Sequence, residues 1–167
     1  MSSDFVHLHL HTQYSLLDGA NRTKDLIKHV LKSGMSAVAV TDHGNMFGAF
    51  DIQSEAIDHG LKPILGVEAY IAPGSRHERE AVKTVDGEGN SYHLTLLAET
   101  PEGYRNLSHV VSEAFLTGFY YKPRMDWELL EAHHQGLIAL SGCVKSEVSQ
   151  RLLAGDFAGA RETALKY

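Results

Sequence analysis

The sequence predicts an α/β fold, a sheet or barrel that is left open. Short apolar runs alternate about five times with stretches whose apolar residues recur at helical spacing, which is typical of parallel strands joined by crossover helices. The chain has 167 residues, 43% hydrophobic and 22% charged, the composition of a folded globular domain with its own core. Five strands are fewer than the eight of a standard closed barrel, so we expect an incomplete barrel within a longer protein.

The chain opens with a strand pattern. Phe5–Leu10 alternates with period two, so its apolar residues fall on one face, as in a half-buried strand. These apolar residues are Val6, Leu8 and Leu10. The opposite face carries only histidines, namely His7, His9 and His11.

Two helix patterns and two strand patterns follow. Thr23–Lys32 has apolar residues at helical spacing, with its first residue as N-cap and Gly34 as a stop signal. Gly48–His59 is also predicted to be helical. Its apolar positions are Ala49, Phe50, Ala56 and Ile57. Ala37–Thr41 and Pro63–Ile71 are apolar runs that predict buried strands.

The second half begins with Ala72–Ser91, whose glycines and mixed charges predict a polar surface excursion or hairpin. Thr100 and Pro101 have the residue types of a helix start. The other predicted elements are a strand at Tyr92–Ala98, a helix from Pro101 through Phe115, a short helix at Asp126–His133, a strand at Gly136–Ser141, and helices at Lys145–Leu153 and Asp156–Tyr167.

Composition limits the compartment and the partners. The single cysteine, Cys143, excludes an internal disulfide and fits a reducing compartment. No apolar run approaches the roughly 20 residues of a membrane span, and the start lacks signal-peptide features, so we expect a cytoplasmic protein without a membrane partner. The net charge of -6 has the wrong sign for gripping nucleic acid by charge alone, so any nucleic-acid contact must be local.

The candidate chemistry lies where predicted strands end, because loops at these ends share one rim in parallel α/β folds. His9 and His11 end the first strand and lie roughly 7 Å apart at a rise of about 3.3 Å per residue, near enough to chelate one ion. The alternative interpretation is that His9 and His11 simply lie on a solvated face of the strand. Asp18 follows in the loop, and His43 follows the second strand beside Asp42, which orients it or merely forms a turn.

Three further residues complete the candidate set. Glu68 is a carboxylate within an apolar strand, where burial demands either a cation or a salt bridge. His93 begins its strand, so only an irregular or reversed strand brings it to the rim. Cys143 is by default a small buried hydrophobe, and beside zinc it is a thiolate. We assign no role to the remaining histidines His29, His59, His77, His109, His133 and His134.

Nitrogen, carboxylate and sulfur ligands together suit zinc, with manganese or iron as alternatives in an oxygen-rich site. Six or seven ligands exceed one tetrahedral site, which predicts two or three ions. Clustered metals activate a water molecule and clamp phosphoryl oxygens, so phosphoester hydrolysis is the expected chemistry. The sequence has neither of the Gly-rich nucleotide-binding motifs.

The ordered motifs resemble the polymerase and histidinol phosphatase (PHP) domain, and in particular the one at the amino terminus of bacterial DNA polymerase III alpha subunits. The resemblance covers essentially the whole chain. The motifs that carry it are His7–Thr12, Tyr14–Gly19, Thr41–Met46, Gly66–Tyr70, Tyr92–Leu97, Gly103–Leu107 and Ser141–Cys143.

This resemblance implies a distorted (β/α)7 barrel with a trinuclear metal site at its rim. The ligands it implies are His9, His11, Asp18, His43, Glu68, His93 and Cys143. It also implies an aspartate and a histidine ligand in a later motif, so we expect residues 1–167 to be one PHP domain truncated before that motif and incomplete at its C-terminal end.

By the same resemblance, the intact domain is expected to have zinc-dependent 3′-5′ exonuclease capacity. The parent protein would synthesise DNA on magnesium-binding carboxylates outside this chain, and would meet DNA, a sliding clamp and a proofreading exonuclease. Two alternatives stay open: a metal-stabilised scaffold that docks a separate proofreading subunit, and a free-standing histidinol-phosphate phosphatase-like phosphoesterase.

Overall fold

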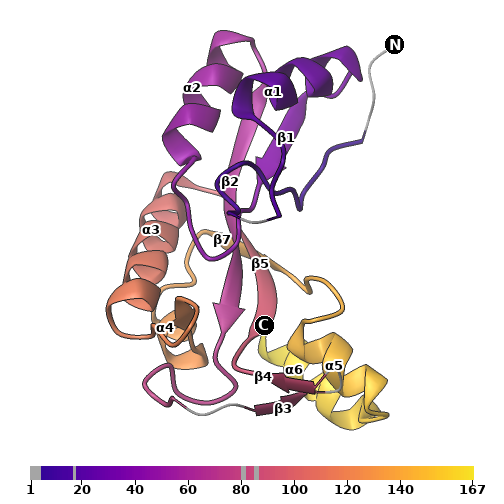
Figure 1. The fold of residues 1–167 in the computed structure, drawn as a ribbon, viewed down its shortest axis with the longest axis vertical. Coiled ribbons are helices and arrows are strands. Elements are labelled where there is room, and N and C mark those ends of the chain that lie inside the picture. Colours follow the sequence, from indigo (N-terminus) through magenta and orange to yellow (C-terminus); the bar gives the residue numbers. More distant parts are fainter. Residues whose placement is uncertain (1–4, 17, 80–81, 85–86) are drawn as a thin grey trace.

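A computed structural model describes residues 5–16, 18–79, 82–84 and 87–167. Its strands run through the centre of the molecule and its helices lie around them (Figure 1). The helices are α1 (Thr23–Lys32), α2 (Ala49–Asp58), α3 (Pro101–Leu116), α4 (Trp127–Ala132), α5 (Glu147–Leu153) and α6 (Phe157–Lys166). The strands are β1 (Ala37–Val40), β2 (Lys62–Ile71), β3 (Val82–Thr84), β4 (Gly87–Gly89), β5 (Tyr92–Ala98), β6 (Arg124–Met125) and β7 (Leu137–Leu140).

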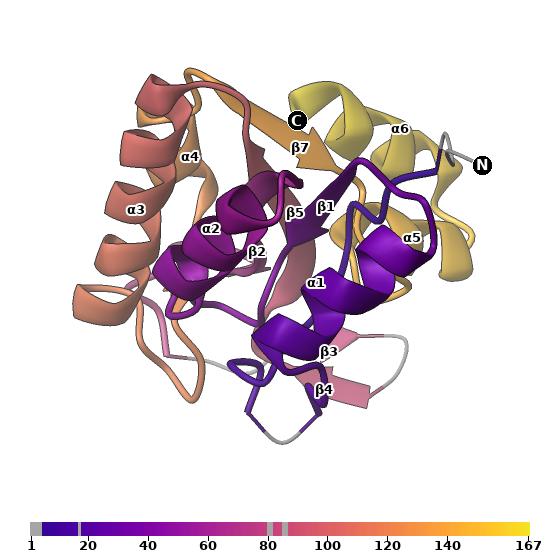
Figure 2. The same cartoon turned by 90° about the horizontal axis from the view of Figure 1, so that it is seen from above.

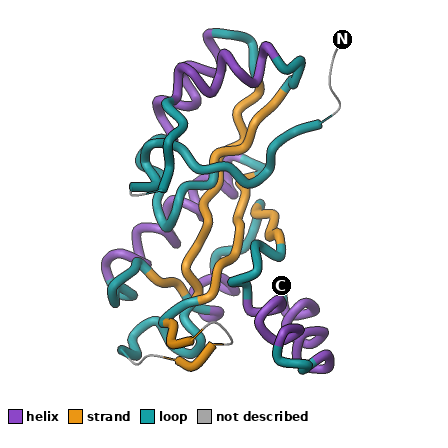
Figure 3. The backbone as a smooth tube through the Cα atoms, turned by 45° about the vertical axis from the view of Figure 1, so that its right-hand side comes forward, coloured by secondary structure: helices purple, strands orange, loops and turns teal. Residues whose placement is uncertain are grey.

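The main sheet is mixed, with the order β1-β2-β5-β7. β1 pairs in parallel with the first half of β2, and β6 pairs in parallel with its end. β5 runs antiparallel to β2, with Glu68 opposite Thr95 and Tyr70 opposite His93. β7 runs antiparallel to β5, and β3 and β4 form a separate antiparallel pair. The strands form an open sheet rather than a closed barrel within the described part of the chain (Figure 3), as expected.

Two hydrophobic clusters hold the helices on the strands. One packs α3 and α4 against β2 and β5, and the other packs α1 and α2 against β1. Seen from above, α3 and α4 lie on one side of the strands and α5 and α6 on the other (Figure 2). In β2 the side chains of Val67, Ala69 and Ile71 belong to the first cluster. Because successive strand residues alternate, Glu68 and Tyr70 face the opposite side of the sheet.

The prediction that all strands are parallel is wrong for β5, which is antiparallel to both of its neighbours. Alternating strand and helix patterns favour parallel strands, but the segment between β2 and β5 contains a hairpin, β3–β4, instead of a crossover helix. The predicted polar excursion over residues 72–91 is thereby confirmed as containing a hairpin. The two-residue strand β6 was not predicted.

The predicted strand Phe5–Leu10 is not a regular strand, although it lies beside β1. The amide of Ala39 donates to the carbonyl of His7, and the amide of Thr41 donates to that of Leu10, at 2.8 and 2.9 Å. The bonded residues are therefore three positions apart on one segment and two positions apart on the other, which interrupts the ladder as a β-bulge does. The predicted apolar face is only partly buried, since Leu10 packs against the second hydrophobic cluster but Leu8 is 41% exposed.

Two details of the predicted helices are also corrected. The N-cap of α1 is Arg22 rather than Thr23, and no side chain caps that end. In α2 the predicted apolar residues Phe50 and Ile57 are 76% and 60% exposed, whereas Ile52 and Ala56 are fully buried. Periodicity predicted the helix correctly, but the packing of α2 against β2 and α1 selects a different face. Among the described residues, no helix is both long and apolar enough to cross a membrane.

Candidate metal centre

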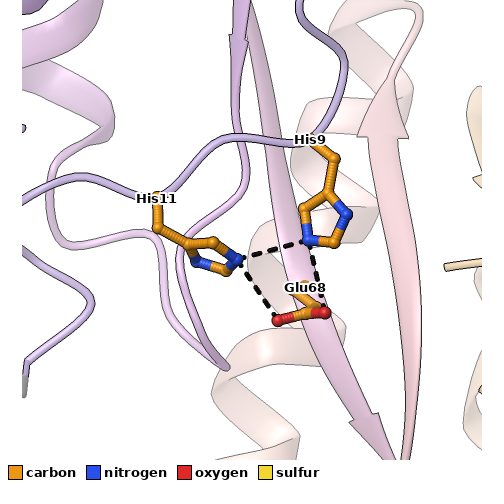
Figure 4. Close-up of side chains that lie close together, drawn as sticks. All are labelled: His9, His11 and Glu68. Atoms are coloured by element: carbon orange, nitrogen blue, oxygen red, sulfur yellow. Dashed lines mark hydrogen bonds and ion pairs between the residues drawn. The ribbon is translucent and has the colours of Figure 1, made fainter. Parts of the chain in front are cut away.

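The centre of the site is the carboxylate of Glu68, whose side chain is only 2% exposed. Four imidazoles surround it. Its Oε1 lies 3.3 Å from His9 Nε2 and 3.0 Å from His93 Nδ1. Its Oε2 lies 3.4 Å from His11 Nε2 and 2.6 Å from His43 Nδ1. Figure 4 shows His9 and His11 directed at the carboxylate from the N-terminal segment.

The two edges of β2 bring His43 and His93 to this carboxylate. On one edge the chain continues beyond β1 in register, so that His43 lies opposite Glu68, and the carbonyl of Asp42 accepts the Glu68 amide at 3.0 Å. On the other edge β5 runs in reverse, so its first residues lie beside the end of β2, and His93 pairs with Tyr70. The sequence predicts that His93 reaches the rim only on an irregular or reversed strand, and β5 is reversed.

Buried hydrogen bonds fix the N-terminal segment that carries His9 and His11. The carboxylate of Asp42 accepts from the amide and hydroxyl of Thr12 at 2.6 and 2.8 Å, and from the hydroxyl of Ser15 at 2.6 Å. The Ser15 oxygen also lies 2.9 Å from His11 Nδ1 and accepts the amide of His43 at 3.0 Å. Asp42 therefore orients the site through its neighbours, rather than merely forming a turn.

Asp18 and Cys143 lie at opposite borders of the cluster. The Asp18 carboxylate is 2.8 Å from Nε2 of His43, on the ring edge turned away from Glu68, and its side chain is 59% exposed. The sulfur of Cys143 is 3.7 Å from Nδ1 of His93. Cys143 reaches this place because β7 runs antiparallel to β5 and ends near the start of that strand. All seven predicted site residues thus belong to one chain of contacts.

The charges of the cluster are reflected in its pKa values. Burial raises the pKa of Glu68, but the close imidazoles of His43, His9 and His93 outweigh burial and hold that pKa far below its usual range. The adjacent carboxylate of Glu68 raises the pKa of His43. Burial, followed by the charge of His43, lowers the pKa of His11. Burial and the nearby carboxylates of Glu68 and Asp18 raise the pKa of Tyr70 to about 12.

This donor set fits a divalent metal. Two groups of three have ligand atoms within 4.8 Å of one another, His9–His11–Glu68 and His43–Glu68–His93, and both share Glu68. Nδ1 of His43 and Oε2 of Glu68 are buried and close, yet neither has a properly oriented hydrogen bond. Buried polar atoms are normally satisfied, and a cation that both atoms bind would satisfy them. Imidazole and carboxylate donors suit zinc.

Sequence reasoning missed the roles of Thr12 and Ser15, because single hydroxyl residues in a loop carry no periodic signal. It also missed Tyr70, whose ring centroid lies 5.2 Å from that of His93 and 6.1 Å from that of His43. The alternation of β2 would have found Tyr70, since it shares a face with Glu68. None of the histidines to which no role was assigned lies among the contacts of Glu68.

Comparison with known proteins shows the family of this chain. The PHP domain family model matches residues 7–167. The chain belongs to the PHP domain family. It is 50% identical over 98% of its length to DNA polymerase III subunit alpha of Deinococcus radiodurans, and 51% identical over 94% to that of Thermus aquaticus. It spans only 12% and 13% of those relatives, so it corresponds to about one eighth of their length.

A solved structure described as that of a metal-dependent phosphoesterase from Bifidobacterium adolescentis aligns at 19% identity over 68% of this chain and 34% of that chain. Its TM-score is 0.45, which is too low to support an inference about this chain.

Proposed function

We propose that residues 1–167 are part of the PHP domain of a DNA polymerase III alpha subunit, and that this domain is a metal-dependent phosphodiesterase acting as a 3′-5′ exonuclease. One observation carries the proposal: a buried carboxylate, Glu68, has four imidazole nitrogens 2.6–3.4 Å from its oxygens. An ordinary salt bridge needs one partner. Four imidazoles around one carboxylate are better explained by bound cations that share it.

In this proposal His9 and His11 hold one zinc ion with Glu68, and His43 and His93 hold a second with the same carboxylate. These are the two groups of donors that lie within 4.8 Å of one another. Asp18 and Cys143 would complete the ligand set at the borders of the cluster, where a third ion could bind. Manganese or iron are alternatives to zinc. When bound, such ions supply an activated water and electrostatic stabilisation of phosphoryl oxygens.

The chain's own residues hold this arrangement. Ser15 fixes the ring of His11 and the backbone of His43, while Asp42 holds the Ser15 hydroxyl. The rings are thus oriented before any ion binds, which is the usual role of hydrogen-bonded partners behind metal ligands. Such preorganisation favours a defined site over a loosely solvated group of histidines.

The parent protein would carry DNA-directed DNA synthesis on magnesium-binding carboxylates that lie outside this chain. We propose, from the named relatives, that it works in the cytoplasm on DNA with other replisome subunits, including a sliding clamp and a proofreading exonuclease. The PHP domain would then be one module of a replicative enzyme.

The test compares the full-length protein with the double variant His9→Ala plus His11→Ala. We expect zinc, measured by elemental analysis, and nucleotide release from a labelled single-stranded oligonucleotide to fall together. The matched control is His29→Ala plus His59→Ala, which also removes two imidazoles but touches no ligand, and it should match the wild type. If zinc is lost and nucleotide release is unchanged, the exonuclease proposal is wrong and the site is structural.

A further inference from the structure

An open pocket of about 490 Å³ lies against one side of the metal cluster. Asp18, His43 and His93 form its wall on the cluster side. Its other lining residues include two lysines, Lys122 and Lys145, which come from separate loops. This volume is that of a small-ligand site, so the pocket is large enough to hold one nucleotide beside the proposed ions.

The loop that carries Lys122 is held in an unusual backbone conformation. Tyr121 has φ = 58°, which is uncommon for a residue other than glycine and is kept only where the surrounding structure imposes it. The amide of Tyr120 donates to the carbonyl of Lys122 at 3.0 Å and closes the turn. The ammonium of Lys122 then lies 5.2 Å from the ring centroid of Tyr70, on the sheet face that carries Glu68.

Lys145 is fixed to the cluster from the other side. Its carbonyl accepts the backbone amide of His93 at 3.1 Å, and it follows Cys143 by two residues. Within the described part of the chain, no ion pair uses Lys122 or Lys145. Two cations without a carboxylate partner at the mouth of a metal-binding pocket favour an anionic ligand, and phosphate is the anion that the proposed chemistry requires.

Aromatic side chains extend from this pocket over the surface. Phe115 lines the pocket, and its ring centroid lies 5.9 Å from that of Phe47 and 6.4 Å from that of Phe119. These side chains are 38%, 65% and 52% exposed, respectively. A row of exposed aromatic rings marks a binding surface. Aromatic rings beside cations are the composition with which proteins hold the bases and phosphates of single strands.

We propose that this pocket binds the terminal nucleotides of a single-stranded DNA, with Lys122 and Lys145 holding backbone phosphates and Phe115 stacking on a base. The inference rests on the proposed function and specifies its substrate. Bases in a duplex are stacked on each other and cannot meet Phe115, so a frayed or single-stranded end is required. The net charge of -6 is compatible with DNA binding, because the proposed phosphate contacts are confined to the two lysines of one pocket.

The first test locates the strand without relying on activity. An oligodeoxynucleotide with 5-iododeoxyuridine at its 3′ end is irradiated on the full-length protein, and the cross-linked peptide is identified by mass spectrometry. We expect a cross-link at Phe115 that falls roughly 10-fold in Lys122→Ala plus Lys145→Ala, since both phosphate contacts are lost. The matched control Lys28→Ala plus Lys32→Ala, which removes two lysines of α1, should leave the cross-link unchanged.

The second test separates binding from catalysis. Lys122→Ala plus Lys145→Ala should raise the KM for a single-stranded oligonucleotide by roughly 10-fold with kcat within about 2-fold, and Lys122→Arg plus Lys145→Arg should restore it. Phe115→Ala should weaken binding by roughly 10-fold, in the range reported for one base stack, whereas Phe115→Tyr should not. Phe157→Ala removes a phenylalanine that is 71% exposed on α6 and serves as the control.

Two results would overturn this inference. One is a cross-link that maps elsewhere and is insensitive to the lysine variants. The other is that Phe115→Ala keeps a normal zinc content and a normal KM but loses a contact with another part of the parent protein. The row of aromatic rings would then be a protein interface. A wild type without nucleotide release, but with the cross-link at Phe115, would refute the exonuclease proposal and leave the binding site standing.

Discussion

The shared carboxylate makes Glu68→Gln the most informative substitution in this chain. Glu68 belongs to both groups of candidate ligands, whereas His9 belongs to one. Glutamine keeps the volume of the side chain but loses the negative charge and one good metal-binding oxygen. We therefore expect Glu68→Gln to remove two ions from the full-length protein, and His9→Ala to remove one.

The energetic expectation follows from binding linkage. At a free metal concentration a hundred times the dissociation constant, each ion stabilises the folded state by about 2.7 kcal/mol. Loss of both ions thus removes about 5 kcal/mol of metal-dependent stability, and loss of one removes about half of that. In excess chelator this difference between the variants should disappear, because neither protein then holds an ion.

The assay is equilibrium dialysis against buffered zinc followed by elemental analysis, with hydrogen exchange of the β2 amides as a measure of local stability. His59→Ala, an exposed histidine at the end of α2, is the control and should bind zinc as the wild type does. If Glu68→Gln lost no more zinc than His9→Ala, the carboxylate would not be shared and the arrangement proposed for the two ions would be wrong.

Three other predictions follow from particular contacts. Ser15→Ala removes the hydroxyl that orients two histidines and should weaken zinc binding by about 10- to 100-fold in competition with a chelator. Leu107→Ala empties a fully buried position and should lower the free energy of unfolding in urea by about 2–5 kcal/mol, whereas Leu116→Ala, at a 77% exposed position, should change it little. Burial raises the pKa of Asp126, but its hydrogen bonds from the backbone amides of Arg76 and Leu129, and from the Arg76 guanidinium, outweigh burial and lower it. Ionised Asp126 therefore stabilises the fold above its unfolded pKa of about 3.8, and this contribution is lost as pH falls through the lower folded-state value; Asp126→Asn should flatten the acid side of the stability curve measured by thermal unfolding.

The sequence was most informative where one residue contradicts its surroundings. Glu68 is a carboxylate in an apolar strand, and burial of such a group requires a partner. That single conflict predicted the centre of the site. Ser15 presents no conflict, because a hydroxyl residue in a loop is expected whether or not it orients a ligand. Its role depends on its distances to His11 and Asp42, which no local pattern encodes.

The fold was predictable in its elements and less so in their directions and faces. Bounds such as those of Thr23–Lys32 and Tyr92–Ala98 agree with the structure, because hydrophobic periodicity is a local signal. The direction of a strand is not local, since the same residues pair in either orientation. The exposure of Phe50 instead of Ile52 in α2 likewise depends on which face of the helix meets β2 and α1, and this is decided by tertiary packing.

The reversal of β5 is what makes the proposed site geometrically complete. Glu68 lies near the end of β2, six residues after Lys62, where the strand begins. Had β5 run parallel to β2 over the same six pairs, Gly66–Ile71, His93 would lie beside Val67, whose side chain belongs to the first hydrophobic cluster, on the face of the sheet opposite Glu68. In the antiparallel register His93 instead pairs with Tyr70, and its Nδ1 lies 3.0 Å from Glu68. The parallel edge of β2 supplies His43 from the end of one strand, and the antiparallel edge supplies His93 from the start of another. In this mixed sheet one buried carboxylate therefore meets histidines from both neighbouring segments.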